Sequence, residues 1–149
     1  MSTYVSNTKA RFNYEILETI EAGIELFGFE VKAIKKGQGS LDAAYVIIRG
    51  GEAYIIGSNI PKYQPSNMPK DHDPERNLKL LLTKKEIREL AEKEAVKGLA
   101  IIPLSLYGKG RRIKVQIAIA RGKKLFDKRE TIKKRETDRE TRAAVKERR

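Results

Sequence analysis

The sequence contains no cysteine and no tryptophan, and it has a single histidine. The absence of cysteine excludes disulfides, catalysis by a thiol and zinc sites held by thiolates. No apolar stretch approaches the length of a membrane span, and the first residues lack the apolar core of a signal peptide. We therefore expect a soluble, cytoplasmic protein that binds neither a membrane nor a cofactor.

The one histidine, His72, lies between two aspartates in a proline-rich stretch. It admits two interpretations: a metal ligand or general base, or a loop residue that organises a turn through its neighbours. The second is favoured, because no other histidine or cysteine completes a ligand set. The sequence also has no phosphate-binding P-loop and no glycine pattern of a nucleotide-binding fold. We expect a protein that has no metal site and is not an enzyme.

Basic residues are in large excess, with 32 lysines and arginines against 20 aspartates and glutamates, for a net charge of +12. This excess favours phosphate-bearing partners and predicts salt-dependent binding, whereas a solvated surface of balanced charge would not leave such a surplus. Aromatic residues make up only 7%, which favours recognition of RNA shape and backbone over stacking on bases. Tyr45 and Tyr54 lie in predicted strands, where packing within the sheet is the expected role.

The surplus charge is concentrated in residues 121–149, which hold 13 lysines and arginines against 6 aspartates and glutamates. This segment has too few apolar residues to bury a core of its own. We expect a basic C-terminal tail that is disordered when free and orders on a polyanion, with residues 1–120 forming one domain. A membrane surface is the competing polyanion, but the tail lacks the wide apolar face of an interfacial helix.

The beginning of the chain predicts a hairpin. Residues 1–10 are polar and are expected to be loose. Apolar and polar residues alternate over 12–16, which is typical of a half-buried strand, and the alternation slips at Leu17 and Ile20, where a bulge or bend is plausible. The turn-like residues 21–23 are expected to close this first hairpin.

The middle of the chain predicts a helix, a second hairpin and a long loop. Val31 and Ile34 have helical spacing within 30–36, and Gly37 is expected to end that helix. Two β-branched runs within 41–56 flank a Gly-Gly pair, and glycine accepts the positive φ of a tight hairpin turn. Four of the five prolines fall in 57–77, which indicates an irregular surface loop.

The last part of the domain adds strands and one clear helix. A buried strand is predicted over 78–82, and a capping box at Thr83 opens a helix. A strand over 99–107 contains Pro103, which requires an edge or a bulge. Clean alternation over 113–119 indicates another strand. We predict a mainly β fold, a small antiparallel β-barrel of OB-fold type with flanking helices.

Short motifs in this chain resemble, in order and at matching spacing, those of the SsrA-binding protein family, also called small protein B. They are Asn7-Thr8-Lys9-Ala10-Arg11, Glu21-Ala22-Gly23, Phe29-Glu30-Val31-Lys32, Asp71-His72-Asp73-Pro74, Lys79-Leu80-Leu81-Leu82, Pro103-Leu104-Ser105-Leu106-Tyr107, Lys114-Val115 and residues 121–129. The resemblance covers about residues 7–149. It implies an OB-fold-like, monomeric protein that binds the tRNA-like domain of transfer-messenger RNA in trans-translation, the rescue of stalled ribosomes.

The resemblance also implies the residues that make contact. By motif, the RNA-binding residues are Asn7, Lys9, Arg11, Glu21, Leu81 and Lys124. The tail is implied to enter the small-subunit decoding region and the messenger channel and to become helical there. By motif, the residues of the tail that contact the ribosome are Gly122, Lys123, Lys124, Phe126, Asp127, Lys128 and Arg129. The chain departs from the pattern at Phe12, Leu78 and Phe126, where the family often has side chains capable of polar contacts.

Two other functions remain open from the residues alone. A structural protein of the ribosome would be stoichiometric on all ribosomes, whereas a rescue factor would associate only when its RNA partner is present. A nuclease or RNA-modifying enzyme on a small β-barrel would turn over RNA, although the single histidine argues against this.

Overall fold

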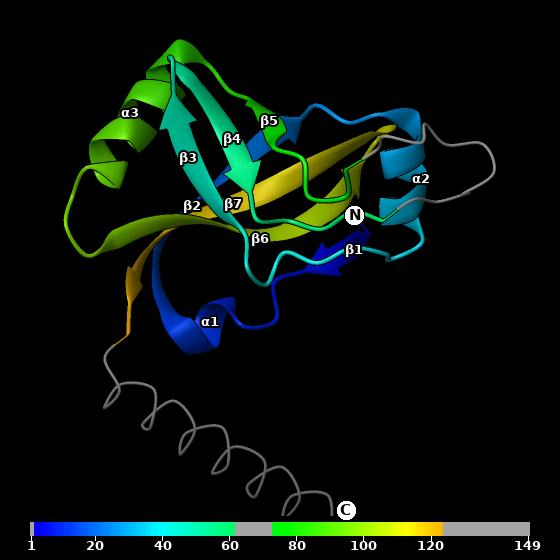
Figure 1. Cartoon of the computed structure of the whole chain (residues 1–149). Helices are drawn as coiled ribbons and strands as arrows, with labels where there is room; N and C mark the ends of the chain where they lie inside the picture. The colour runs from blue at the N-terminus through cyan, green and yellow to red at the C-terminus, as the bar shows by residue number, and fades with distance from the viewer. Residues whose placement is uncertain (1, 62–72, 124–149) are drawn as a thin grey trace, which may run out of the picture.

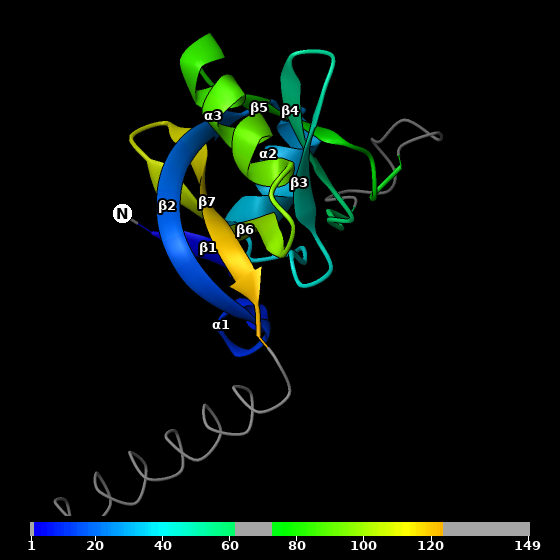
Figure 2. The ribbon, with the colours of Figure 1, turned by 90° about the vertical axis from the view of Figure 1, so that its left-hand side faces the viewer.

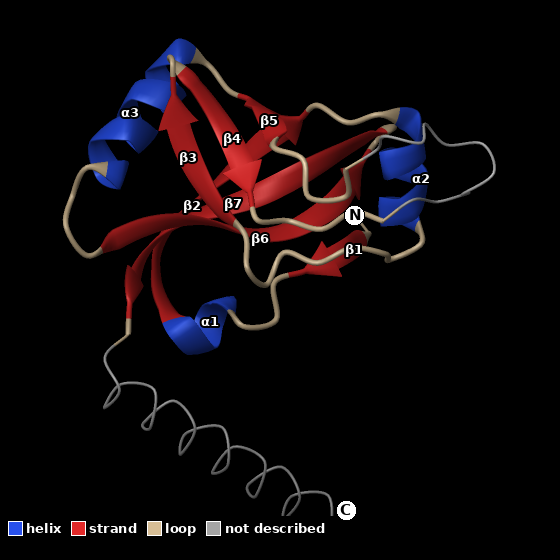
Figure 3. Ribbon diagram, in the orientation of Figure 1, coloured by secondary structure: helices blue, strands red, loops and turns tan. Residues whose placement is uncertain are grey.

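The computed structural model describes residues 2–61 and 73–123, and this part of the chain is mainly β (Figures 1 and 3). The elements are β1 Thr3–Ser6, α1 Ala10–Asn13, β2 Tyr14–Ile24, α2 Gly28–Lys35, β3 Tyr45–Arg49, β4 Glu52–Ile56, β5 Leu78–Leu81, α3 Lys84–Glu94, β6 Leu99–Lys109 and β7 Arg112–Gly122. The strands form one antiparallel sheet in the order β1-β6-β7-β2-β5-β4-β3. Within the described residues, no hydrogen-bonded pairing joins the edge strands β1 and β3, so the sheet is open.

Two apolar cores lie on opposite faces of the long strands. The predicted alternation in β7 is confirmed, because Val115 and Ile117 are almost completely buried in the main core. Strong curvature of the long strands (Figure 2) lets β3 contact β6 across this core. Ala118 and Ala120 point to the other face, since successive strand residues alternate. There they pack with Ala10 of α1 in a smaller second core.

The predicted helices and the second hairpin are confirmed. Thr83 caps α3 by accepting a hydrogen bond from the amide of Glu86, whose carboxylate accepts one from the amide of Thr83. Gly37 follows α2 with a φ of 75°. Gly50 and Gly51 connect β3 to β4 with φ values of 59° and 74°, the left-handed conformation that favours glycine.

Both predicted irregularities in the strands are also present. The register of β2 against β7 shifts between Ile16 and Glu18, which places a bulge at Leu17. The register of β6 against β7 shifts between Pro103 and Ser105. Because β6 lies between β1 and β7, the proline is accommodated by this bulge rather than by an edge position.

Two expectations for the beginning of the chain are wrong. Residues 1–10 are not loose throughout, because β1 pairs with β6 and buries Val5. The strand begins at Tyr14, with Phe12 in α1, and no turn interrupts it at 21–23. The glycine that suggested a turn, Gly23, faces Leu81 instead. A Cβ at Gly23 would lie 3.1 Å from the Cβ of Leu81, so a small residue leaves room for the neighbouring strand.

The predicted loop over 57–77 falls largely on residues 62–72, which lie outside the described residues. Its two ends are held together, since the amide of Ile60 donates to the carbonyl of Pro74 over 2.9 Å. Ile60 itself is buried in the main core. No helix in residues 2–61 and 73–123 is long and apolar enough to cross a membrane.

Candidate nucleic-acid interface

The described residues predicted to bind RNA lie in two groups at opposite ends of β2. Asn7, Lys9 and Arg11 are in or next to α1, at the end where Tyr14 begins the strand. Glu21 lies near the far end of β2, and Leu81 ends the neighbouring β5. With a rise of about 3.3 Å per residue, the seven residues from Tyr14 to Glu21 give a path of about 23 Å along the curved strand between the two groups. Lys124 lies outside the described residues.

Asn7 fixes the connection between β1 and α1 to the sheet. Its amide donates to the carbonyl of Leu104 over 2.7 Å, and its Nδ2 donates to the carbonyl of Pro103 over 3.0 Å. The Oδ1 atom of Asn7 is buried and accepts no hydrogen bond among the described residues. Lys9 and Arg11 follow with exposed side chains. The asparagine therefore positions the two cations.

The end of β7 joins this first group. Gly122 pairs with Tyr14, and the amide of Lys123 donates to the carbonyl of Asn13 over 2.9 Å. The Nζ of Lys123 donates to the carbonyl of Arg11 over 2.8 Å. These contacts place Gly122 beside the start of β2 and Lys123 against α1. The other predicted tail residues, Lys124, Phe126, Asp127, Lys128 and Arg129, lie outside the described residues.

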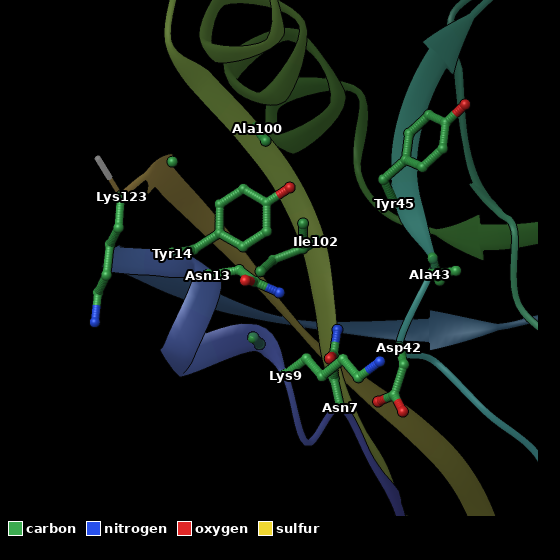
Figure 4. A pocket seen from close by; sticks show the side chains of 13 residues that line it. Asn7, Lys9, Asn13, Tyr14, Asp42, Ala43, Tyr45, Ala100, Ile102 and Lys123 are labelled. Carbon is green, nitrogen blue, oxygen red and sulfur yellow. The ribbon is translucent and has the colours of Figure 1, made fainter. Parts of the chain in front are cut away.

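A hollow of about 570 Å³ opens beside this group, between α1, β6 and the start of β3 (Figure 4). Tyr14 and Tyr45 stand on its two sides, and Ile102 lies between them. Tyr45 is 49% exposed and so is not a core residue, although it lies opposite Ile56 in the β3–β4 pair, as expected for a cross-strand neighbour. Lys9 and Lys123 also line the hollow, which thus combines aromatic, apolar and cationic side chains. Sequence reasoning missed it because its walls come from three distant segments.

In the second group, Glu21 is bound to two side chains of β6. Its carboxylate accepts a hydrogen bond from the phenol of Tyr107 and one of 3.0 Å from Nζ of Lys109. The hydrogen bond from Tyr107, and then the one from Lys109, lowers the pKa of Glu21 below its ordinary value. Burial, and then the bond to Glu21, raises the pKa of Tyr107 above its ordinary value. Glu21 is therefore an oriented anion in a strand, not a turn residue.

Leu81 is 54% exposed and lines a groove beside the tip of the β6–β7 hairpin. Arg111, Arg112 and Lys114 line the same groove, so an exposed apolar side chain sits among three cations. The sequence signal for this grouping was the clean alternation from Ile113 onward, which places the two arginines at a strand end. The pairing of β2 with both β5 and β7, which brings Leu81 to that tip, had no such signal.

The described residues contain no group of three or more histidines, cysteines or carboxylates that would hold a metal ion. His72 is outside the described residues. The interface offers exposed cations and two exposed or half-buried tyrosines beside α1, which suit binding of a polyanion. Its one oriented carboxylate, Glu21, can accept hydrogen bonds from a ligand.

Comparison with known proteins gives one consistent result. The family model for the SmpB protein matches residues 4–147. The SsrA-binding protein of Mesoplasma florum is 51% identical over 133 residues, which cover 89% of this chain and 89% of the relative. The SsrA-binding proteins of Gloeothece citriformis and Chelativorans sp. are 50% and 46% identical, over 94% and 99% of this chain and 90% and 96% of the relatives.

Among solved structures, a chain from a study of tmRNA-SmpB and the center of the bacterial ribosome matches with a TM-score of 0.66 and 41% identity. The match covers 80% of this chain and 84% of that one. Sequence and fold thus agree over most of the length. The chain belongs to the SmpB protein family.

Proposed function

We propose that this protein binds the tRNA-like domain of transfer-messenger RNA, the SsrA RNA, and delivers it to stalled ribosomes for trans-translation. The observation that carries this function is the identity of 46–51% with SsrA-binding proteins over most of the chain. The solved tmRNA-SmpB structure links the same fold to the ribosome. The net charge of +12 supplies the attraction to RNA.

The two groups of side chains suggest how the RNA is held. Arg11 and Lys9 bind phosphates at the α1 end, and Asn7 positions them through its bonds to β6. At the other end Glu21 accepts hydrogen bonds from base amino groups or 2′-hydroxyls, while Leu81 packs against an apolar face. The phosphate contacts at the α1 end give affinity, and the contacts of Glu21 and Leu81 give selectivity for a folded RNA.

The division of labour in the chain follows from its charge. A domain over 1–120 binds the RNA, and a tail over 121–149 reaches the small-subunit decoding region and the messenger channel. The support for this division is the +7 net charge of the tail, given by 13 basic against 6 acidic residues. Lys124 serves the RNA site because it directly follows Lys123, which is hydrogen-bonded to α1. Gly122, Lys123, Phe126, Asp127, Lys128 and Arg129 begin the ribosomal contact.

The finer fold assignment is an OB-type barrel. The support is that β3 returns to contact β6 on the far side of the main core. A curved sheet whose last strand, β3, approaches the second strand, β6, in this way is a partly open barrel. The protein works as a binding factor in the cytoplasm, where ribosomes act, and as a monomer. Its single histidine and lack of cysteine give no support to catalysis.

A gel-shift series tests the function. Transfer-messenger RNA, an ordinary tRNA and a generic duplex are titrated with the full chain at several salt concentrations. We expect the tightest binding to transfer-messenger RNA. Its affinity should fall steeply with rising salt, whereas the ratio of that affinity to the affinities for the other two RNAs should change less. Glu21→Ala and Leu81→Ala should lose selectivity. Equal affinity for all three RNAs would contradict the proposed function.

A further inference from the structure

The segment that carries Lys9 and Arg11 cannot hold its own shape. α1 has only four residues, far fewer than an isolated helix needs to be stable in water. Its N-cap residue is Lys9, which forms no side-chain hydrogen bond that would cap the helix within the described part of the chain. Lys9 and Arg11 are both exposed. The place of these two cations therefore depends on contacts between this segment and the rest of the domain.

One side of the segment is anchored to β6. Ala10 is buried in the second core with Ile102 and Leu104 of that strand. Asn7 donates its two hydrogen bonds to carbonyls of the same strand. Anchors on β6 alone would let the segment pivot about that strand. A fixed position requires a further contact on the other side, where the hollow separates the segment from the start of β3.

Asp42 supplies a contact on that other side. Its Oδ1 accepts a hydrogen bond of 3.0 Å from the amide of Thr8 and another of 3.2 Å from the hydroxyl of Thr8. Asp42 lies beside Asn7 and Lys9 at the edge of the hollow (Figure 4). A carboxylate that accepts two donors from one residue fixes both the backbone and the side chain of that residue. The Thr8–Asp42 contact thus holds the chain directly before Lys9.

Asp42 itself stands on a turn that is built into the main core. Leu41 and Ala44, on either side of it, are buried there. The amide of Ala44 donates to the carbonyl of Leu41 over 3.0 Å, which closes the turn. The amide of Asp42 donates to Oγ of Ser40 over 3.3 Å. The α1 segment is therefore held between two parts of the domain, β6 on one side and the turn before β3 on the other.

We propose that Asp42 is a positioning residue for RNA binding: through Thr8 it holds Lys9 and Arg11 where they bind phosphates. The proposal rests on the proposed function, because it takes these two cations to be phosphate contacts. It also makes a prediction of unusual sign. A carboxylate next to an anion-binding group repels phosphate, so by charge alone its removal would strengthen binding. If Asp42 positions the cations, its removal weakens binding instead.

Variants matched in charge separate the two effects. Asp42→Ala, Asp42→Asn and Glu89→Ala each remove one negative charge, and Glu89 is an exposed residue of α3. Asp42→Asn keeps an oxygen that accepts from Thr8. In gel shifts with transfer-messenger RNA, Asp42→Ala should bind about three- to fivefold more weakly than the wild type, whereas the other two variants should bind at least as tightly as the wild type. Binding of Asp42→Ala as tight as that of Glu89→Ala would overturn the proposal.

A double-mutant cycle shows whether Asp42 acts through the two cations. Asp42→Ala is added to a chain that already carries Lys9→Ala and Arg11→Ala, so that no α1 cation is left to position. The added substitution should then change the affinity for transfer-messenger RNA by less than about 1.5-fold. An undiminished loss of affinity would place the action of Asp42 elsewhere and overturn the proposal.

Hydrogen exchange tests the Thr8–Asp42 contact without RNA. The amide of Asn13 donates to the carbonyl of Lys9 over 3.0 Å, so its exchange reports on α1. This amide should exchange faster in Asp42→Ala, at an unchanged urea midpoint, and at the wild-type rate in Asp42→Asn and Glu89→Ala. Unchanged exchange in Asp42→Ala overturns the proposal whatever the RNA result. If the exchange changed as expected but the wild type showed no preference for transfer-messenger RNA, the proposed function would fail instead, so the two failures are distinguishable.

Discussion

The phenol of Tyr107, on β6, donates a hydrogen bond of 2.5 Å to the carboxylate of Glu21, on β2, although β7 lies between the two strands. Tyr107 is only 9% exposed, so its ring is anchored in the sheet while its hydroxyl reaches the carboxylate at the surface. Lys109 holds the other carboxylate oxygen. Glu21 is thereby fixed in one orientation before any ligand arrives, which lowers the conformational cost of binding.

Tyr107→Phe is expected to weaken binding of transfer-messenger RNA about fivefold, because a single hydrogen bond that orients Glu21 is lost without loss of the ring. Filter binding at constant salt measures the effect. Tyr54→Phe, on β4, is the matched control and should change nothing. If Tyr107→Phe bound as tightly as the wild type, Glu21 would need no support from the phenol.

Glu21 also predicts a pH dependence of stability. Its pKa is lowered in the folded state, so on acidification the unfolded chain takes up the proton first. The stabilisation is present above the ordinary value of 4.5 and is lost as the pH falls through the folded pKa. Urea midpoints of the wild type and Glu21→Gln should thus differ by a constant amount from pH 7 to about 5 and converge below 4.5. Convergence already near pH 6 would contradict this assignment.

A buried ion pair holds the segment after residue 72 to α2. The Nε and Nη2 atoms of Arg76 donate to the carboxylate of Glu30, which is 1% exposed, over 2.8 and 2.6 Å. Arg76 also stacks on the ring of Phe27, 4.4 Å from its centre. Arg76→Ala should therefore cost about 3–5 kcal/mol of unfolding free energy, since it leaves a buried carboxylate without its cation.

Urea unfolding measures this cost, and Arg49→Ala provides the comparison. Arg49 pairs with Glu94 over 3.0 Å, but its side chain is 65% exposed. Its loss should cost less than about 1 kcal/mol, as for other surface pairs. Similar losses from both substitutions would mean that burial does not distinguish the two pairs.

Local patterns were sufficient to predict much of the fold. The capping box at Thr83, the Gly-Gly turn after β3 and the alternation in β7 each depend on neighbouring residues, and the structure confirms all three. The hairpin expected at 21–23 was wrong because Gly23 is required by a contact with Leu81, 58 positions away in the chain and across a strand pair. Spacing along the sequence carries no information on such a contact.

The candidate site was predictable in composition but not in arrangement. Motif resemblance singled out Asn7, Arg11 and Glu21, yet nothing in the sequence indicated that they divide between two ends of one strand. Tyr107 was noted only as part of a strand motif, because its bond to Glu21 depends on the order β6-β7-β2. Strand order is a property of the whole chain, and it decides which side chains share a surface.

We propose that one part of the chain binds the RNA and that another part acts on the ribosome. The most direct measurement compares the full chain with a chain ending at Lys124, which retains the contacts of Lys123 with α1. Both are assayed for affinity to transfer-messenger RNA and for tagging of a stalled nascent chain. We predict that the shortened chain binds the RNA within about threefold of the full chain, since neither proposed RNA group is removed, and that it supports no tagging. Loss of RNA affinity in proportion to the loss of tagging, or tagging at the full rate, would contradict the account.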